Sequence, residues 1–341
     1  VHTMSNITVG LDIAKNVFHA VAMDSRGNIK TRKLLKRSQV SKYFANHEIA
    51  TIVMEACGSS NHWARIIQKL GHDVKLIPPQ HVVAYRRKGK NDYNDAEAIA
   101  EASQRPNMTF VPIKTIAQQE LQSLLRVRER KVSDRTRIAN QIQGLTAEFG
   151  IALNKGRAAI SKQLPKVIGE IENELTASMR LLLSELRNEY LQIDEAVKLL
   201  DKEIRSITAN NQVCKRALSV PGIGPINAAT IYASIGNGQY FKNGRHFAAW
   251  CGLVPKQNST GGKNNLGGIT KRGNGQIRQL LVHGARSALM WAGRKHEPDN
   301  MLNWALQLKA QKHSNKATVA LANKMARVVW AVIAHDQAYI A

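Results

Sequence analysis

The fold is decided by the stretch ITVGLDIAKNVFHAVAM, residues 7–23. It contains two runs rich in β-branched and other apolar residues, 7–13 and 17–23, which are typical of β-strands. The turn residues Ser25-Arg26-Gly27-Asn28 follow, and residues 29–34 return to a strand-forming composition. The sequence therefore predicts three consecutive antiparallel strands.

Helices and strands alternate after these three strands. We expect a short helix at 39–47, a buried strand at 50–56 (ATIVMEA), a helix at 60–70, a strand at 73–77 and a helix from about 94 to 104. Three antiparallel strands followed by alternating units are the element order of ribonuclease H-like domains, in which helices pack on a mixed sheet. We predict an α/β domain of this ribonuclease H-like kind over residues 1–112.

Four acidic residues fall at matching positions of this predicted domain. Asp12 lies near the end of the first strand and Glu55 near the end of the fourth, and these strands are neighbours in this topology. Asp92 and Asp95 lie three residues apart where the last helix begins, in GKNDYNDAEAIA, so they share a helical face. Clustered carboxylates repel one another unless cations neutralise them, and oxygen ligands favour Mg²⁺ or Mn²⁺. Two such ions can polarise a phosphodiester and stabilise its attacking and leaving oxygens.

Each acid taken alone also has an ordinary structural interpretation. Asp12 could be a turn acid, Glu55 a surface residue, and Asp92 or Asp95 a helix N-cap. Their joint placement on one topology favours the metal site. The basic run directly before Asp92 is suited to phosphate contacts, although an ordinary solvated loop has the same composition. Its cations are Arg86, Arg87, Lys88 and Lys90.

Residues 113–210 are predicted to form a helical arm. Apolar residues recur at spacings of three and four from Leu121 to Phe149, and a second amphipathic stretch covers 172–208. Pro165 and two glycines interrupt the pattern between them. Two long helices of this kind are typical of a coiled-coil arm that mediates dimerisation, although a plain interdomain bundle has the same pattern.

The charge of the chain indicates a polyanionic partner. The 341 residues carry a formal net charge of +24, and the pI is about 10.2. Such an excess destabilises a compact protein through self-repulsion, so a partner that neutralises it is favoured over a merely basic enzyme. Residues 214–341 carry 17 Lys and Arg against 3 Asp and Glu. That part of the chain is the strongest candidate for contacting phosphates.

Cysteine spacing and hydropathy argue against other classes of protein. Cys57, Cys214 and Cys251 form no Cys-x-x-Cys pair, which excludes a disulfide framework and a zinc cluster of the usual spacing. The sequence contains no signal peptide and no apolar run of about 18 residues. We therefore expect a cytoplasmic protein, associated with the bacterial nucleoid when it acts and without a membrane partner.

The predicted C-terminal domain, residues 211–341, is mostly helical and begins with a glycine-rich turn. The segment LSVPGIGPINAATIYASIG at 218–236 has a Pro-Gly-Ile-Gly turn before an alanine-rich helix. Gly222 and Gly224 permit a tight turn, and the helix N-terminus offers N–H groups to a phosphate. This is the pattern of a helix-hairpin-helix-like motif that grips the nucleic-acid backbone. A helical turn that serves packing alone is the alternative.

A second glycine-rich segment surrounds Ser259. The loop Ser259-Thr260-Gly261-Gly262 is followed by four cations, and no histidine lies within a few residues of the serine. A serine hydroxyl is a poor nucleophile unless a base or a metal activates it. Spacing alone therefore indicates a loop or cap residue. The cations are Lys263, Lys271, Arg272 and Arg278.

Six segments of the chain are distinctive: GLDIAK, MEACG, KNDYNDAEAIA, PGIGPINAATI, GLVPKQNSTGGK and GGITKRGNGQIRQLL. Together and in this order they resemble the insertion-sequence 110 transposases and their Piv/MooV invertase relatives, from about residue 7 to 290. The resemblance implies a RuvC-like DEDD domain, a coiled-coil arm and a C-terminal transposase domain. It assigns Asp12, Glu55, Asp92 and Asp95 as the metal-binding tetrad. It also assigns Ser259 as the serine of the S-x-x-G loop, with the hydroxyl of Thr260 beside it.

The resemblance also implies the chemistry. A noncoding bridge (or seeker) RNA would pair separately with donor and target DNA, and the serine would form a covalent phosphoserine intermediate before strand exchange. Metal ions held by the tetrad could lower the pKa of the serine hydroxyl, which removes the need for a nearby histidine. A homodimer, or a tetramer built as a dimer of dimers, is expected because exchange between two duplexes needs more than one active site.

Other functions are compatible with parts of the sequence. A RuvC-like metal-dependent nuclease or junction resolvase would use the tetrad to hydrolyse DNA, with Ser259 merely structural. A Piv-like DNA invertase would act without a guide RNA. A protein that only organises RNA or DNA would carry a vestigial site, but the intact tetrad argues against this last function.

Overall fold

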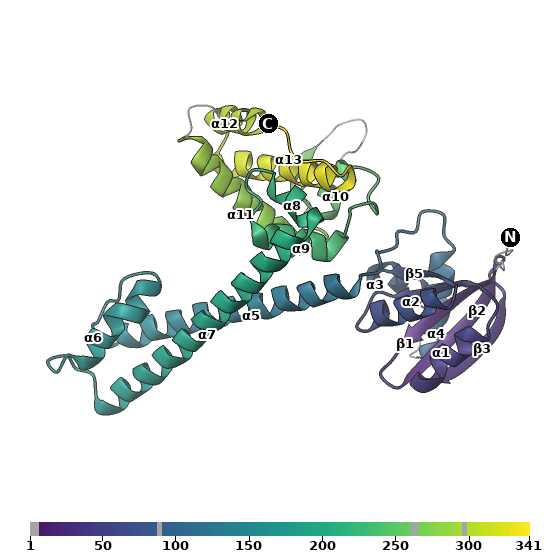
Figure 1. The fold of residues 1–341 in the computed structure, drawn as a ribbon, viewed down its shortest axis with the longest axis horizontal. Helices are drawn as coiled ribbons and strands as arrows, with labels where there is room; N and C mark the ends of the chain where they lie inside the picture. The colour runs from purple at the N-terminus through teal and green to yellow at the C-terminus, as the bar shows by residue number, and fades with distance from the viewer. Residues whose placement is uncertain (1–6, 87–90, 259, 261–264, 295–298) are drawn as a thin grey trace. The chain divides into compact units, whose positions relative to one another are not determined.

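The computed structural model describes residues 7–86, 91–258, 260, 265–294 and 299–341. The chain divides into two compact units, residues 1–115 and 116–341, and Figure 1 colours them along the sequence. The predicted division into three parts, with boundaries after residues 112 and 210, stays a prediction. The helical arm and the C-terminal segment both belong to the second unit.

A five-stranded mixed sheet forms the centre of the first unit. The strand order is β3-β2-β1-β4-β5, with β1, β2 and β3 antiparallel and β4 parallel to both β1 and β5. The strands are β1 (Ile7–Ile13), β2 (Val17–Asp24), β3 (Ile29–Lys36), β4 (Thr51–Glu55) and β5 (Asp73–Ile77). The mixed sheet that the sequence predicted is thus confirmed, and so is the pairing of its first and fourth strands.

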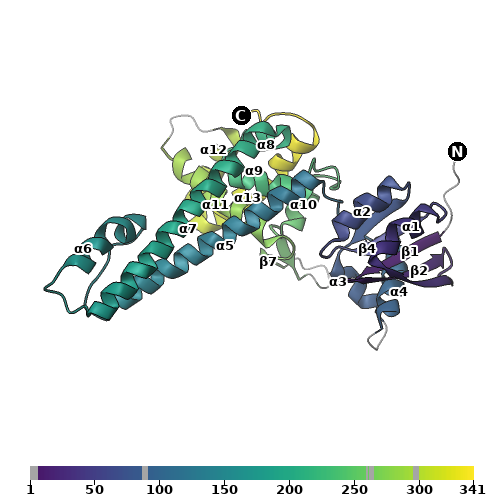
Figure 2. The same ribbon diagram turned by 60° about the horizontal axis from the view of Figure 1, so that its bottom comes forward.

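Helices cover both faces of this sheet, as Figure 2 shows. Val9 and Leu11 of β1 pack with α1 and α2, while Val53 of β4 packs with α4 on the other face. Because side chains alternate along a strand, the even residues of β1, including Asp12, face α4. The helical segments are η1 (Arg37–Gln39), α1 (Val40–Ala45), α2 (Ser60–Lys69), α3 (Pro79–Val82), η2 (Val83–Tyr85) and α4 (Asp92–Ser103).

Helix α4 lies unusually close to β1 because Gly10 has no side chain. A Cβ atom at this position would lie 2.0 Å from the carbonyl oxygen of Ala96 and 2.7 Å from the backbone nitrogen of Ala100. The buried alanines of α4 keep the helix surface equally shallow on this side. The glycine therefore fixes how near the first turn of α4 comes to the end of β1.

Two long helices form the arm of the second unit, and they lie side by side in Figures 1 and 2. They are α5 (Ile116–Ala147) and α7 (Ala177–Asn210), as the apolar spacing predicted. Residues 148–176 join them, and this segment contains a π-helical turn, η3 (Ala159–Gln163), and α6 (Leu164–Gly169). Coiled-coil geometry and dimerisation through this arm stay predictions.

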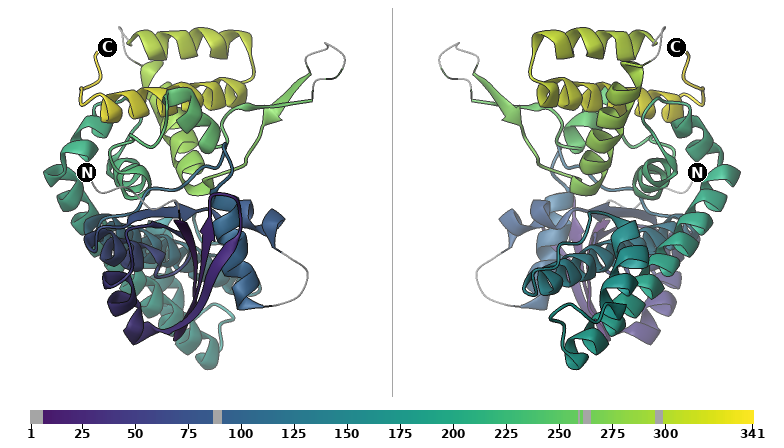
Figure 3. Two further views of the ribbon diagram at one scale, coloured as in Figure 1. Left: turned by 90° about the vertical axis from the view of Figure 1, so that its right-hand side faces the viewer. Right: turned by 90° about the vertical axis from the view of Figure 1, so that its left-hand side faces the viewer.

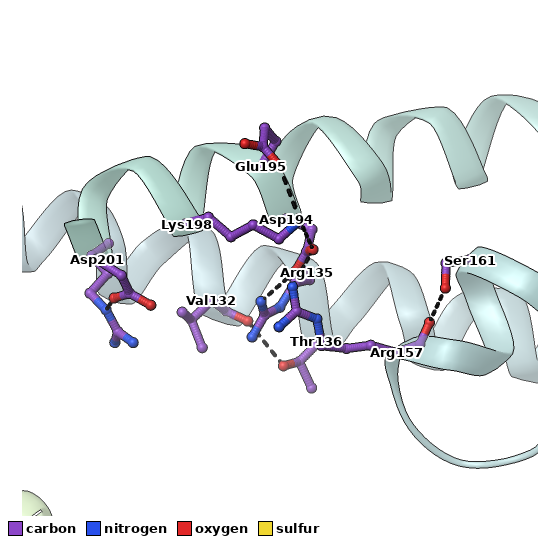
Figure 4. A network of polar contacts seen from close by, with 10 residues as sticks. Val132, Arg135, Thr136, Arg157, Ser161, Asp194, Glu195, Lys198 and Asp201 are labelled. Atoms are coloured by element: carbon purple, nitrogen blue, oxygen red, sulfur yellow. Dashed lines mark hydrogen bonds and ion pairs between the residues drawn. The ribbon is translucent and has the colours of Figure 1, made fainter. Parts of the chain in front are cut away.

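An ionic network around Asp194 ties the connecting segment to both arm helices (Figure 4). Asp194 of α7 accepts a hydrogen bond from Nη1 of Arg135 on α5 at 2.7 Å and another from Arg157 in the connection, and Nζ of Lys198 lies 3.4 Å away. Burial alone would raise the pKa of Asp194, but the hydrogen bonds from Arg157 and Arg135 outweigh it and hold that pKa below its ordinary value.

The remainder of the second unit is mostly helical, as predicted, and carries one two-stranded hairpin, β6–β7, among its described residues. Figure 3 shows this hairpin extending from the helices. Hydrogen bonds from the backbone nitrogens of Thr270 and Lys271 to the carbonyls of Val254 and Gly252 hold its base. The elements are α8 (Gln212–Leu218), α9 (Pro225–Ile235), α10 (Gly244–Trp250), β6 (Pro255–Gln257), β7 (Leu266–Ile269), α11 (Gly275–Ala292), α12 (Asn300–Gln311) and α13 (Ser314–Ala334).

Helix α13 lies at the core of this helical part. Its side chains Leu321, Met325 and Val329 are buried in one cluster with residues of α8 to α11. By length and composition it is the one helix among the described residues that could cross a membrane, contrary to the expectation that no such apolar run exists. Its apolar residues are accounted for by packing, since 50% of the apolar stretch is buried within the protein.

Candidate active site

Neighbouring strands bring two of the candidate side chains, Asp12 and Glu55, into a row with His19 on the face of the sheet that α4 covers. Asp12 of β1 pairs with His19 of β2. The β1–β4 register pairs Leu11 with Met54, so the next residues along these parallel strands, Asp12 and Glu55, are also neighbours. Strand parity places all three side chains on the α4 side of the sheet.

The first turn of α4 adds the other two acids. Its N-cap is Asn91, whose side chain accepts a hydrogen bond from the backbone nitrogen of Tyr93 at 3.0 Å, so neither Asp92 nor Asp95 is the capping residue. Both acids lie in the first turn, where the positive end of the helix dipole stabilises negative charge. Helix capping therefore does not account for the presence of Asp92 and Asp95 at this position.

The electrostatics of Asp12 place the other three acids near its carboxyl group. Burial raises the pKa of the Asp12 carboxyl, the negative charges of Asp95 and Asp92 raise it further, and Glu55 adds a smaller effect in the same direction. His19 acts in the opposite sense. The structure thus gathers the predicted tetrad at one end of the sheet, where its charges repel one another.

Arg86 supplies the positive charge in this cluster. Its Nη2 atom lies 3.2 Å from Oε2 of Glu55, and its Nε atom lies 3.0 Å from Oδ1 of Asp95. As the described side chains lie, no group of three or more His, Cys, Asp or Glu is arranged to hold a metal ion. The donor set still fits Mg²⁺ or Mn²⁺ because it consists of carboxylate oxygens, although the side chain of Asp92 is 60% exposed, against 16% for Glu55 and 35% for Asp95.

Two features of this cluster were not found from the sequence. His19 places Nε2 3.9 Å from Oδ2 of Asp92 and its ring edge-on to Tyr93, while its buried Nδ1 has no hydrogen-bond partner among the described residues. Strand alternation next to Asp12 was the signal that could have revealed it. Arg86 was predicted to contact phosphates, and its pairing with the acids was missed. The other cations of that run, Arg87, Lys88 and Lys90, lie outside the described residues.

The predicted glycine turn lies between α8 and α9. Gly222 has a φ of +84°, and a Cβ there would lie 2.7 Å from the carbonyl oxygen of Gly284 in α11. Nδ2 of Asn227 donates to the carbonyl of Leu280 at 3.2 Å and so fastens the turn to the same helix. Gly222 therefore has a packing role of its own, whereas Gly224 at the start of α9 has open space beside it.

The serine-bearing segment is described only in part. Ser259 and Lys263 lie outside the described residues, and Thr260 is exposed. Lys271 and Arg272 are exposed just beyond β7, whereas Arg278 donates from Nη1 to the carbonyl of Cys251 at 2.9 Å. Burial raises the pKa of the Cys214 and Cys251 thiols to about 12, so neither is a reactive thiolate at neutral pH.

Comparison with known proteins identifies the family of the chain. A family model described as "Transposase", of the DEDD type of IS110 elements, matches residues 9–149. A second, described as "Transposase IS116/IS110/IS902 family", matches residues 214–299. These regions contain the acidic cluster and the glycine-rich motifs, respectively.

Named transposases are similar over nearly their whole length. A probable family 20 transposase of Pseudomonas aeruginosa is 42% identical over 97% of this chain and 98% of its own. The transposase for insertion sequence element IS1111A of Coxiella burnetii is 40% identical over 99% and 92%, and that for IS1328 of Yersinia enterocolitica is 38% identical over 96% and 97%. Fold, acidic cluster and relatives together define an insertion-sequence transposase, an enzyme that cleaves and rejoins DNA. Within that class, the chain belongs to the IS116/IS110/IS902 transposase family.

Proposed function

We propose that this transposase is an RNA-guided recombinase in which the tetrad holds Mg²⁺ or Mn²⁺ and Ser259 is the nucleophile. The observation that supports the metal site is the gathering of acids around Asp12, whose carboxyl pKa is raised by burial and further by the charges of Asp95, Asp92 and Glu55. The residues that would hold the ion are Asp12, Glu55, Asp92 and Asp95. The proposal keeps the three-part organisation: a RuvC-like domain over 1–112, an arm over 113–210 and a transposase domain over 211–341.

The proposed reaction is a balanced exchange of phosphoesters. The Oγ atom of Ser259 attacks the phosphorus and the serine hydroxyl loses its proton. The bond between the phosphorus and one deoxyribose oxygen breaks, and this oxygen leaves as a hydroxyl group after gaining one proton. A sugar hydroxyl of the other duplex then attacks the phosphoserine and releases the serine, so rejoining requires no external nucleotide. A divalent cation, when bound, supplies positive charge that stabilises the attacking and leaving oxygens.

Nucleic acid is proposed to contact the basic residues that precede Asp92 and those that follow Ser259 in the sequence. Phosphate contacts are assigned to Arg86, Arg87, Lys88, Lys90, Lys263, Lys271, Arg272 and Arg278, and to the turn at Gly222 and Gly224. The exposure of Lys271 and Arg272 supports this assignment. Donor and target sequences would be read by base pairing with a bridge RNA, which leaves the protein to recognise shape and backbone. A homodimer or a dimer of dimers, acting at the nucleoid, completes the proposal.

The nucleophile is tested by trapping the covalent intermediate. Cleavage reactions of the full-length protein are resolved on denaturing gels, where a DNA strand that carries protein migrates slowly. We expect Ser259→Ala to abolish this adduct and leave RNA binding intact, with Thr260→Ala as the matched control that still forms it. Asp12→Asn should abolish cleavage as well. Protein-free DNA ends produced by a still active Ser259→Ala variant would favour the metal-dependent resolvase instead.

The guide is tested by sequencing the nucleic acid that copurifies with the protein expressed from its element. A discrete RNA from the flank of the element is the expected result. Recovery of no such RNA, together with an intact covalent adduct, would favour an invertase-like recombinase that acts without a guide.

A further inference from the structure

A groove of about 1110 Å³ lies where the β6–β7 hairpin meets α12 and α13. Residues of β7 form one side, Trp304 of α12 lies on another, and one face of α13 completes it. The hairpin that contributes β7 encloses residues 258–265 and so carries the segment that contains Ser259. None of the residues after 300 has a place in the function proposed so far.

Three cations follow the groove along α13. Lys316, Lys324 and Arg327 line it at helical spacings of eight and three, which places them on one face of the helix over a length of about 16 Å. Among the described residues none of them has a carboxylate partner. The two described acids of residues 214–341 are used elsewhere, since Asp299 caps α12 and Asp336 pairs with Arg216.

The cationic track continues beyond the groove. Lys324 and Arg327 also line an adjoining hollow of about 470 Å³, where Arg245 of α10 adds a further positive charge. Helix α10 packs closely against α13 at this hollow, because a Cβ on Gly244 would lie 2.8 Å from the carbonyl oxygen of Arg327. The arrangement therefore suits a linear polyanion rather than a single small anion.

The groove also offers an aromatic surface among the cations. The side chain of Trp304 is 37% exposed, and Nζ of Lys324 lies 4.6 Å from the centre of its ring. Leu253, Ile269 and Val319 add apolar wall beside it. Proteins bind unpaired nucleic-acid strands by combining a basic groove with aromatic rings on which bases stack. A duplex hides its base faces and makes no use of such a ring.

We propose that this groove binds an unpaired nucleic-acid strand, with phosphates along Lys316, Lys324 and Arg327 and a base against Trp304. The inference depends on the proposed function in one respect, that the ligand is a nucleic acid. It adds to that function a binding site for a single strand next to the hairpin that contains the proposed nucleophile. Unpaired RNA and unpaired DNA share this chemistry.

The charge contribution is tested by measuring the affinity of the full-length protein for labelled strands of about 12 nucleotides, by fluorescence anisotropy. The groove variant combines Lys316→Glu and Arg327→Glu. The control variant combines Lys242→Glu and Lys312→Glu, which change the net charge by the same amount at exposed positions outside the groove. We expect the groove variant, and not the control variant, to bind about tenfold more weakly or worse. The slope of log affinity against log salt should decrease in magnitude by about 1.4, the value for two lost phosphate contacts. Equal effects of the two variants, or an equal loss on duplex DNA, would overturn the proposal.

The aromatic contribution is tested with Trp304→Ala and Trp304→Phe. Stacking predicts a loss of about fivefold or more for alanine and near wild-type affinity for phenylalanine. Unchanged thermal unfolding shows that each variant is folded. Wild-type affinity of Trp304→Ala for both strands would overturn the base contact. Parallel titrations with RNA and DNA of one sequence identify the strand, because a loss specific to either one supports the site.

These outcomes are separable from those of the proposed function. If no covalent adduct forms but the groove variants lose single-strand binding, the phosphoserine chemistry fails and the groove stands. If the adduct forms and the groove variants bind like the controls, the groove fails and the chemistry stands.

Discussion

Gly10 shows how one missing side chain can position the acids of a candidate active site. The glycine lies two residues before Asp12 on β1, and it allows α4 to approach until Asp92 and Asp95 influence the pKa of Asp12. Any side chain at position 10 would meet the backbone of α4 rather than a flexible group. Asp92 and Asp95 are therefore held near Asp12 by a packing contact outside the cluster itself.

We predict that Gly10→Ala lowers the free energy of unfolding by about 1–3 kcal/mol and weakens Mn²⁺ binding. The new methyl group must push α4 away, which is the usual cost of overpacking a close contact. Thermal unfolding and Mn²⁺ titration calorimetry measure the two effects. Gly58→Ala is the matched control, because a Cβ there meets nothing within 4 Å. Similar behaviour of the two variants would contradict this role of Gly10.

Arg86 should compete with metal ions for the acids. Its guanidinium pairs with Glu55 and Asp95, so a cation that binds these carboxylates has to displace it. We predict that Arg86→Ala binds Mn²⁺ several-fold more tightly in calorimetric titrations, and that Mn²⁺ raises its unfolding temperature more than that of the wild type. Arg105→Ala, which removes an exposed pair with Glu101, should leave Mn²⁺ affinity unchanged. Unaltered affinity of the Arg86 variant would show that the arginine does not share the metal site.

At the scale of elements, the arm depends on charge as well as on apolar packing. The cluster that includes Ile142, Ile160 and Leu183 joins α5, the connecting segment and α7. The buried Asp194 adds a fixed point, because cations from all three parts surround it. The connecting segment is therefore attached to the arm through both kinds of contact.

This network makes the stability of the arm depend on pH. The lowered pKa of Asp194 gives a contribution that is fully present above the ordinary carboxyl value of 3.8 and is lost as the pH falls through the lowered value. We predict that Asp194→Asn is about 1–3 kcal/mol less stable than the wild type near neutral pH, and that this gap narrows at acid pH. Urea unfolding followed by circular dichroism measures it. Glu195→Gln, an exposed neighbour, should show a small gap at every pH, and a constant gap for Asp194→Asn would argue against the ionic origin.

Sequence patterns predicted the elements where local signals are strong. The strands of the first unit and the arm helices follow from β-branched runs and helical periodicity, which act over a few residues. The β6–β7 hairpin was missed because its strands, Pro255–Gln257 and Leu266–Ile269, are short and rich in Gly, Pro and Lys. The groove beside the hairpin is completed by residues of α12 and α13, which lie far from the hairpin in the sequence.

At the scale of the whole molecule, the five buried apolar clusters found among the described residues divide between the two units. Two belong entirely to residues 1–115 and three to residues 116–341. A unit that contains its own core can fold on its own. The first unit thus has the means to be stable without the rest of the chain.

We predict that a fragment of residues 1–115 is folded and unfolds cooperatively. Circular dichroism and calorimetry measure this, with a fragment of residues 1–86 as the control. The shorter fragment lacks α4, whose Ala98 and Ile99 complete one of the two clusters, and it should remain unfolded. A disordered 1–115 fragment would show that its clusters are not sufficient.

The placement of the four acids could be predicted from the sequence, whereas the side chains that pair with them could not. Asp12 and Glu55 follow from neighbouring strand ends, and Asp92 and Asp95 from one helical turn. The ion pairs of Arg86 depend on side-chain conformation across three elements, which no periodicity records. The groove at Trp304 likewise combines β7 with two later helices, and the charge excess of residues 214–341 indicated the region without locating the residues.

The double ion pair of Arg86 has a practical consequence. Many small metal sites fold only when loaded, because their ligands repel one another until the ion arrives. Here the chain carries a stand-in cation for two of the acids, Glu55 and Asp95, so we expect the protein to fold and to be stored without added metal. On the proposed chemistry, the enzyme can be assembled with its nucleic acids in the presence of a chelator and held there, intact and silent. Adding the ion then starts every molecule at the same moment.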